Sequence, residues 1–313
     1  MKKALIISDG KPGHFNQSIA LCKHLGVDYE IVEVAYRNTI CRVFSFIFDW
    51  LGIYTGKLVK PTVDLSQITG DLVLSVGSTT YYTNKLLSRR LKIPNIAIHH
   101  PQGYRLDFTH FLCPAHDHPP KHPRLTELPI NLCATDATLF AEKAAEFKTI
   151  HPSEKPAIGI IVGGSNSVSK IISSDFRSQL EQLFSLTEGY ERWITTSRRT
   201  PKEIEEIVES FPFDYKLINS RDPFNPIPAF IQLCDRLFVT SDSTSMISEC
   251  ASFGKAKVEI LMNRQFKTPN KFEELIHGLE NQNAAHVFDG SLADATEKID
   301  LGPMLRKTFN DLI

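Results

Sequence analysis

The chain has 313 residues, of which 42% are hydrophobic and 23% charged, proportions typical of a globular protein that folds in water. Its 35 basic and 36 acidic residues give a net charge of -1, so no global positive field marks it as a nucleic-acid binder. The 6 cysteines include no CxxC pair, which favours reduced thiols in a cytoplasmic protein over a zinc knuckle or a disulfide scaffold. The length is sufficient for two domains.

Short apolar runs alternate with longer segments of helical periodicity, the pattern of a parallel sheet covered on both faces. The first run, residues 4–7, is too short for a signal peptide and is interpreted as part of a strand. In the first half we expect strands at residues 3–8, 29–34, 71–76, 95–99 and 108–114. In the second half we expect strands at residues 157–162, 192–196, 215–219, 236–240 and 256–261.

The segment PSEKP at residues 152–156 separates the two series, and its two prolines disfavour helix. We therefore predict an α/β protein of two Rossmann-like domains that face a cleft. The predicted domains are residues 1–150 and 156–290, followed by a helical tail at residues 291–313 that can pack back on the first domain.

The most apolar stretch, ICRVFSFIFDWLGIY at residues 40–54, is interrupted by Arg42 and Asp49. It is too short and too charged to span a bilayer. Further basic residues flank it on both sides: Arg37, Lys57 and Lys60. The stretch could therefore be an interfacial helix that contacts the inner membrane peripherally. A helix packed into the first core explains the same apolarity, and both alternatives remain open.

The turn DGKPGH at residues 9–14 follows the first strand, where ligands bind in open α/β sheets. Its two glycines allow close backbone approach, and the next helix presents free N–H groups. His14 is a candidate general base for a substrate hydroxyl because the ordinary pKa of histidine lies near neutrality. A capping role is the alternative. The other residues expected to contact that substrate are Asp9, Gly10, Lys11, Gly13 and Asn16.

Histidines are concentrated at residues 99–122, after predicted strands of the first half. His99 and His116 are expected to line the same side as His14, and Asp117 is a second candidate for the general base. The spacing supplies no third ligand for a metal ion, so we expect no metal site.

Three turns in the second half carry polar side chains at strand ends. The residues Gly163, Gly164, Ser165 and Asn166 suit a phosphate or a diphosphate, although a turn needs glycine for geometry alone. Of the neighbouring pair Arg198 and Arg199, Arg198 is the first candidate for phosphate, and a surface pair is the alternative.

The third turn precedes a helix and carries more hydroxyl groups than helix capping requires. Its Ser243, Thr244 and Ser245 could bind phosphates, and Glu249 could accept hydrogen bonds from both ribose hydroxyls.

Four strings together resemble the mitochondrial-fission ELM-type proteins, whose bacterial members are described as nucleoside-diphosphate-sugar epimerase-like. They are DGKPGHFNQS at 9–18, VGGSN at 162–166, ITTSRRTP at 194–201 and VTSDSTSMISECASFGK at 239–255. The segment ending at Glu249 is also similar to that of MurG-type GT-B glycosyltransferases, in which a Glu holds the donor ribose and a glycine-rich loop ends in a His near the acceptor. The resemblance implies these roles for Gly13, His14, Ser243, Thr244 and Glu249. The Lys11-Pro12 pair departs from that loop and makes it stiffer.

The sequence thus predicts a metal-independent GT-B glycosyltransferase that needs no cofactor beyond its nucleotide-sugar donor. The second domain would bind the donor, and the first would bind a membrane-associated glycolipid or lipopolysaccharide-type acceptor of the cell envelope. One alternative is a nucleotide-sugar epimerase or hydrolase on the same fold. The other is a noncatalytic membrane-associated scaffold.

Overall fold

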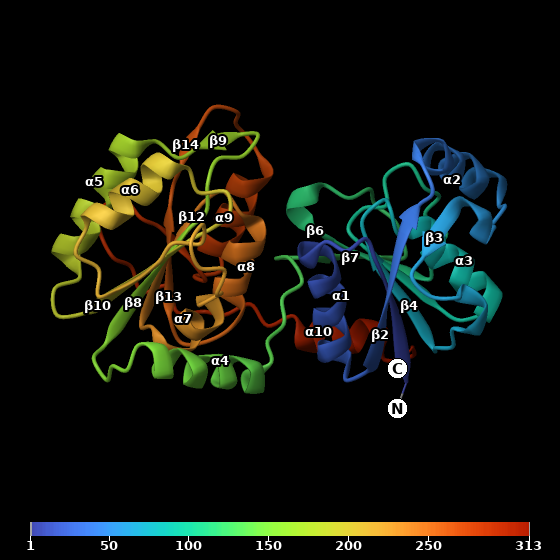
Figure 1. Cartoon of the computed structure of the whole chain (residues 1–313), viewed down its shortest axis with the longest axis horizontal. Coiled ribbons are helices and arrows are strands. Elements are labelled where there is room, and N and C mark those ends of the chain that lie inside the picture. The colour runs from blue at the N-terminus through green and yellow to red at the C-terminus, as the bar shows by residue number, and fades with distance from the viewer. Residues whose placement is uncertain (1, 313) are drawn as a thin grey trace. The chain divides into compact units, whose positions relative to one another are not determined.

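The computed structural model describes residues 2–312 and divides into two compact units, shown in Figure 1. Unit 1 comprises Met1–Thr135 and Leu301–Ile313, and unit 2 comprises Asp136–Asp300. The division lies ahead of the predicted boundary because helix α4 (Ala137–Ile150) belongs to unit 2. Its Phe147 packs against the rings of Trp193, Tyr215 and Phe230, which are all residues of unit 2.

Unit 1 is built on a seven-stranded sheet in the order β3-β2-β1-β4-β5-β6-β7. All neighbours are parallel except β2 and β3. The strands are β1 (Lys3–Ser8), β2 (Asp28–Tyr36), β3 (Val59–Pro61), β4 (Leu72–Val76), β5 (Asn95–Ile98), β6 (His110–Pro114) and β7 (Leu125–Leu128). The helices are α1 (Pro12–Leu25), α2 (Thr39–Leu51), α3 (Tyr81–Leu91) and α10 (Gly302–Phe309), with short 3-10 turns at Gly56–Leu58, Leu65–Gln67 and Ala115–Asp117.

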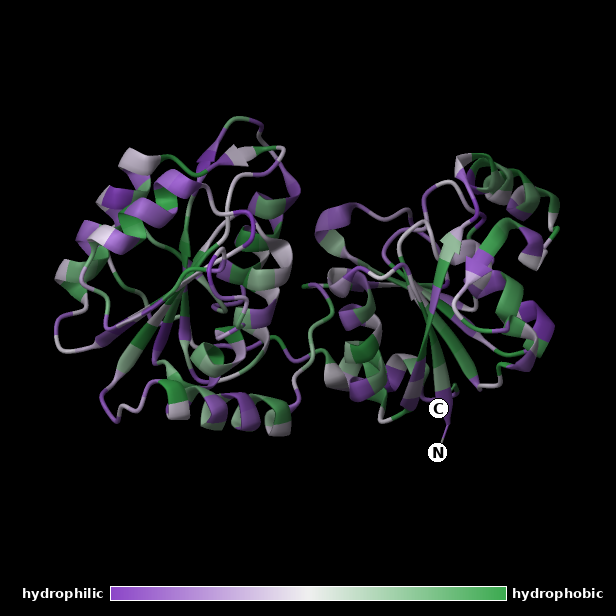
Figure 2. Cartoon of the chain, viewed as in Figure 1, coloured by the Kyte–Doolittle hydropathy of each residue, from purple (hydrophilic) through white to green (hydrophobic). Residues whose placement is uncertain are grey.

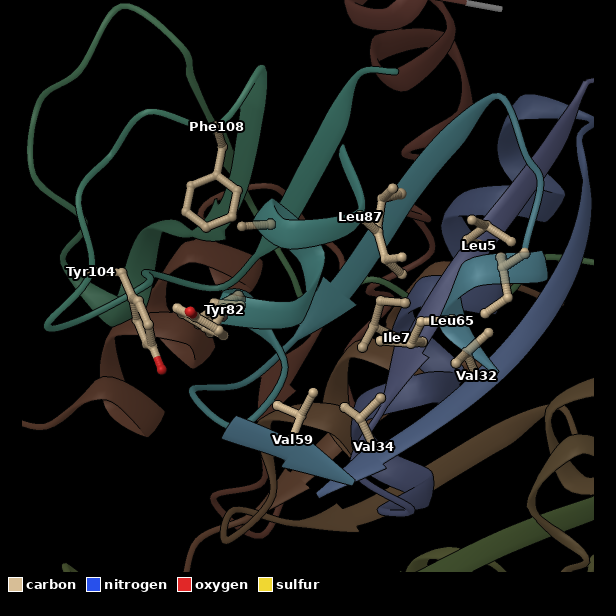
Figure 3. Close-up of a cluster of buried hydrophobic side chains, with 14 of the residues drawn as sticks. Leu5, Ile7, Val32, Val34, Val59, Leu65, Tyr82, Leu87, Tyr104 and Phe108 are labelled. Atoms are coloured by element: carbon tan, nitrogen blue, oxygen red, sulfur yellow. The ribbon is translucent and has the colours of Figure 1, made fainter. Parts of the chain in front are cut away.

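The core of unit 1 explains why its strands are continuously apolar. Figure 3 shows Leu5 and Ile7 of β1 beside Val32 and Val34 of β2. These residues share one face of the sheet because side chains alternate between the two faces along a strand. Ala4 and Ile6, which point to the other face of β1, are buried as well. A parallel sheet covered on both faces requires apolar residues at every position.

Unit 2 is built on a six-stranded parallel sheet in the order β11-β10-β8-β12-β13-β15. Its strands are β8 (Ala157–Val162), β10 (Glu191–Thr196), β11 (Tyr215–Leu217), β12 (Arg236–Thr240), β13 (Lys257–Leu261) and β15 (His286–Val287), with a separate pair of β9 (Ser169–Lys170) and β14 (Arg264–Gln265). Besides α4, the helices are α5 (Ser173–Leu186), α6 (Lys202–Ser210), α7 (Ile227–Leu233), α8 (Thr244–Ser252) and α9 (Lys271–Glu280).

The predicted α/β class and the two strand series are confirmed. The short strands β3 and β7 and the helix α4 have no counterpart among the predicted elements. The predicted tail is helical only in part, since residues 291–301 contain no helix and α10 covers residues 302–309. At its end, α10 lies in unit 1 and packs on α1.

Helix α2 is oriented by a buried charge. The only fully buried residues of α2 are Ser45 and Asp49. The Nζ atom of Lys85 on α3 lies 2.7 Å from Oδ1 of Asp49, and both side chains are at most 1% exposed. Lys85 also contacts Oδ1 of Asp107 at 2.5 Å, and the Tyr54 hydroxyl donates to Asp49 at 2.5 Å. Because an unpaired buried charge is costly, this network holds the Asp49 side of α2 inward.

Replacing Lys85 tests the network. We expect Lys85→Met to destabilise unit 1 by about 3–5 kcal/mol, because Asp49 loses the cation that balances its buried charge. The double variant Lys85→Met/Asp49→Leu removes both charges and should recover most of that loss. Urea unfolding of the three proteins measures the differences, and a double variant no more stable than Lys85→Met would contradict this account.

Candidate functional site

The carboxyl ends of parallel strands lie at one edge of a sheet, and ligands of open α/β sheets bind beyond that edge. In unit 1 the turns after β1, β4, β5 and β6 meet there. They carry Asp9, Gly77, His99 and Asp117, in that strand order. Two histidine–aspartate pairs form along this edge.

The first pair joins His14, in the first turn of α1, to Asp9 after β1. The Nδ1 atom of His14 lies 3.0 Å from Oδ1 and 3.1 Å from Oδ2 of Asp9. A carboxylate only accepts hydrogen bonds, so this contact favours the proton on Nδ1 and leaves Nε2 as a proton acceptor. The Asp9 side chain is 5% exposed and that of His14 33%, so the carboxylate is sheltered while the ring remains accessible.

Glycines make room for this pair. The His14 ring lies against Gly77, where an added Cβ would be 2.9 Å from Cε1 of His14. Gly10 has a φ of 76°, a backbone conformation that favours glycine. Gly13 meets neither condition, since its φ is not positive and nothing lies within 4 Å of an added Cβ. The exposed residues Lys11 and Asn16 complete this end of α1.

The second pair joins His99 to Asp117, the last residue of the short 3-10 turn after β6. Nδ1 of His99 lies 3.0 Å from Oδ2 of Asp117, and both side chains are about one quarter exposed, at 26% and 21%. His99 has a φ of 67°, which is uncommon for a side chain of this size. His116, by contrast, is buried at 4% exposure and is no open ligand contact.

In unit 2 the carboxyl edge is organised by Asp242, which follows β12 and is 1% exposed. Its Oδ2 accepts a hydrogen bond from Arg199 at 2.7 Å, and its Oδ1 accepts one from Thr240 at 2.7 Å. The Thr240 hydroxyl in turn accepts from the backbone N–H of Gly163. Arg199 is therefore engaged with a carboxylate of the protein.

The glycine pair after β8 is explained by close packing. A Cβ at Gly163 would lie 2.2 Å from both carboxylate oxygens of Asp242, and one at Gly164 would lie 2.1 Å from the carbonyl oxygen of Arg199. Asn166 binds the backbone carbonyl of Asp242 and accepts from two N–H groups of its own turn. Ser165 is half-buried between them. Phosphate contacts by these residues stay a prediction. In the structure they allow the turn after β8 to pack closely against Asp242 and Arg199.

Arg198 lies apart from this network and lines an open pocket of about 730 Å³. The pocket is bounded by the turns after β10 and β11 and by the start of α6. Lys202 and Arg221 also line it, together with the hydroxyls of Ser197, Thr200 and Ser220 and the carboxylate of Glu205. Arg221 is paired with Glu209 at 2.5 Å. Its size is within the usual range for small-molecule sites.

Helix α8 begins beside Asp242. The Ser243 side chain caps it by accepting from the N–H of Met246 at 3.4 Å, and Thr244 and Ser245 form its first turn. Glu249 follows on the same helix and is half-buried. No hydrogen bond or ion pair of its carboxylate occurs within residues 2–312, and burial raises its pKa from 4.5 to about 7. Such displaced pKa values are concentrated at functional sites.

The structure thus brings together His14 with Asp9, His99 with Asp117, and the turns of unit 2 at one edge. All four residues of the two pairs were named from the sequence, but their pairing and the pocket residues Lys202 and Arg221 were not predicted. An Asp five residues before a histidine at a strand end was the available signal for the first pair. The cleft predicted between the two halves stays a prediction. Among the described residues 2–312, no group of three or more His, Cys, Asp or Glu could hold a metal ion.

Glu249 generates a prediction on stability. Its carboxyl binds a proton more tightly in the folded chain than in the unfolded one, so ionisation opposes folding as the pH rises from about 4 to about 8. We expect Glu249→Gln to be more stable than the wild type at about pH 8, by up to about 3 kcal/mol, and equal to it at about pH 4. Thermal unfolding across this range measures the difference, and a constant difference at all pH values would contradict it.

Comparison with solved structures places the fold. UDP-GlcNAc 2-epimerase from Methanocaldococcus jannaschii is similar at a TM-score of 0.50 and 14% identity, covering 99% of this chain and 100% of that one. E. coli ADP-heptose lipopolysaccharide heptosyltransferase II gives 0.47 at 12% identity, covering 100% and 98%. Acinetobacter baumannii MurG gives 0.46 at 12%, covering 100% and 90%. At these values only the fold is shared, and it is the two-unit GT-B fold.

No curated protein matches the chain in sequence. The sequence model named mitochondrial fission ELM1 matches residues 12–305. This range includes all the polar turns of unit 2 and, of the two histidine–aspartate pairs, every residue but Asp9. The chain belongs to the mitochondrial fission ELM1 family.

Proposed function

We propose that this chain is a glycosyltransferase that moves a sugar from a nucleotide-sugar to a hydroxyl group of a glycolipid or lipopolysaccharide-type acceptor. Unit 2 binds the donor at its carboxyl edge, and His14 of unit 1 is the general base. The single observation that carries the proposal is the His14–Asp9 pair, in which a sheltered carboxylate holds an accessible imidazole with one nitrogen available to accept a proton.

Donor binding by unit 2 is supported by the arrangement of charge. Arg198 and Lys202 line the pocket after β10 and β11, and α8 starts after β12, two strand positions from β10. Neighbouring strands are about 5 Å apart, so the pocket and the N-terminus of α8 are about 10 Å apart along the edge. An extended diphosphate can contact both, with Arg198 and the N–H groups of Thr244 and Ser245 as donors. Glu249 then accepts from the ribose hydroxyls.

The chemistry balances with groups that the chain supplies. Nε2 of His14 takes the proton of the acceptor hydroxyl while its oxygen forms a bond to the anomeric carbon. The bond from that carbon to the diphosphate breaks, and the nucleoside diphosphate leaves with the electron pair. Arg198 and the positive end of α8 compensate the charge that develops on the leaving group. Asp9 stabilises the imidazolium that forms.

A nucleotide-sugar epimerase is the second candidate, favoured by the presence of two acid–base pairs on one edge. Removing a proton from one face of a sugar and returning one to the other requires two such groups, and His99–Asp117 would be the second. The solved epimerase from M. jannaschii, which shares the fold, is titled as acting on UDP-GlcNAc. The two candidates differ in whether an acceptor accelerates donor turnover.

Replacing His14 tests the base. We expect His14→Asn to lower kcat about 100-fold or more, with the nucleotide-sugar KM nearly unchanged because unit 2 carries the donor contacts. The assay follows nucleoside diphosphate release with and without a lipopolysaccharide-precursor fraction. The matched control is His277→Asn, which removes an exposed histidine paired with Glu280 at 3.2 Å in unit 2.

Two results would contradict this assignment: full activity in His14→Asn, or an equal loss in His277→Asn. If donor turnover is the same with and without the acceptor fraction and depends on both His14 and His99, the epimerase or hydrolase is the correct reading.

The neighbouring arginines test the donor site, because Arg199 is paired with Asp242 whereas Arg198 lines the pocket. We expect Arg198→Ala to weaken nucleotide-sugar binding about tenfold or more and to leave stability unchanged, since Arg198 is exposed. Arg199→Ala should instead destabilise unit 2 by about 2 kcal/mol, because buried Asp242 loses its cation. Titration calorimetry and urea unfolding separate the two effects, and the reverse pattern would refute the assignment of Arg198.

A further inference from the structure

Helix α2 exposes an unusual amount of apolar surface. The large hydrophobic side chains that are exposed include Trp50 at 77%, Ile40 at 65% and Leu51 at 58%. Val43, Phe44 and Ile47 are also exposed on α2, and Ile53 is exposed two residues after its end. Figure 2 shows much of α2 in green, the colour of hydrophobic residues. Single exposed apolar residues are ordinary, but a contiguous group marks an interaction surface.

These residues share one face of the helix. Residues 40, 43, 44, 47, 50 and 51 recur at intervals of three and four, which is the period of one helical stripe. The opposite side is held inward by Asp49 and Lys85, and part of it packs on the core through Phe46 and Phe48. The buried ion pair therefore fixes which side of α2 faces solvent.

The exposed charged residues of the segment that contains α2 are basic. Residues 34–63 contain four basic residues, Arg37, Arg42, Lys57 and Lys60, and all are exposed. Their only acidic residue is Asp49, which is buried against Lys85. The exposed surface of this segment is thus positive in a chain whose net charge is -1.

We propose that the apolar face of α2 docks on the surface of a membrane that contains anionic lipids. An apolar stripe with a tryptophan, flanked by lysine and arginine, is the pattern of a helix that lies in the interface between headgroups and acyl chains. At 13 residues α2 is too short to cross a bilayer. No helix within residues 2–312 is long and apolar enough to do so.

The docking face is connected to the His14 site by direct contacts. Arg42 donates to the Ser78 hydroxyl at 3.2 Å, and the Tyr104 hydroxyl joins Ser45 of α2 to the Ser78 carbonyl. Ser78 follows Gly77, against which the His14 ring lies. Docking of α2 would bring this edge of unit 1 to the bilayer, which is where a glycolipid acceptor presents its hydroxyls. That last step rests on the proposed function, whereas docking itself does not.

Vesicle flotation with the full chain tests docking without any assay of activity. We expect binding to vesicles of phosphatidylcholine with phosphatidylglycerol, weakened by salt, and little binding to phosphatidylcholine alone. The double variant Ile47→Glu/Trp50→Glu should lower the partition coefficient about tenfold or more. Phe266→Glu, a matched control at an apolar residue of unit 2 that is 63% exposed, should bind as the wild type does.

Tryptophan fluorescence locates the contact. The chain has 2 tryptophans, Trp50 at 77% and Trp193 at 4% exposure. Anionic vesicles should shift the emission of the wild type to the blue and leave that of Trp50→Phe unchanged, since Trp193 is already buried.

Three outcomes would overturn the proposal. The first is a wild type that does not float with anionic vesicles, and the second is an Ile47→Glu/Trp50→Glu variant that floats equally well. The third is self-association in the absence of lipid that this variant abolishes while vesicle binding persists, which would assign the face to a second copy of the chain. Circular dichroism of the variants confirms that the exposed substitutions leave the fold intact. Full activity of His14→Asn together with normal flotation of the wild type would contradict the proposed function and not the docking.

Discussion

Parallel strands bring their carboxyl ends to a single edge of a sheet, and this constraint places every candidate chemical group of the chain. In unit 1 it sets Asp9 beside the start of α1, where His14 can reach it. Two strands further along the same edge, it sets His99 beside Asp117. In unit 2 it converges three turns on Asp242, which then requires glycine at position 163. The topology thus determines which turns lie together, and one or two side chains in each turn supply the charged groups.

A second constraint acts on the outer surface of unit 1. Burying Asp49 against Lys85 costs desolvation of two charges, and the geometry offsets this with Tyr54, Asp107 and the backbone of Arg105. A helix anchored by its polar side exposes its apolar side. The same network therefore links the stability of unit 1 to the surface that we propose for the membrane.

The sequence predicted the strands well because parallel strands covered on both faces are continuously apolar, as β1 and β8 are. It predicted the boundary less well because the apolar residues of α4, such as Phe147, do not reveal which core they join. Site residues at strand ends could be named, but not which of them pair with one another. The pairing of His99 with Asp117, and the engagement of Arg199 rather than Arg198, depend on tertiary distances that spacing does not encode. Helix α2 was ambiguous because apolarity alone does not show which side a buried Asp will take.

The proposed function depends on the binding of a nucleotide-sugar at the carboxyl edge of unit 2. Hydrogen–deuterium exchange of the full chain, with and without a panel of UDP-, GDP-, ADP- and CMP-sugars, tests it most directly. We expect at least one of them to slow exchange at residues 197–200, 219–223 and 243–249. Unchanged exchange in all three segments with every member of the panel would contradict it, and would leave the scaffold interpretation in its place.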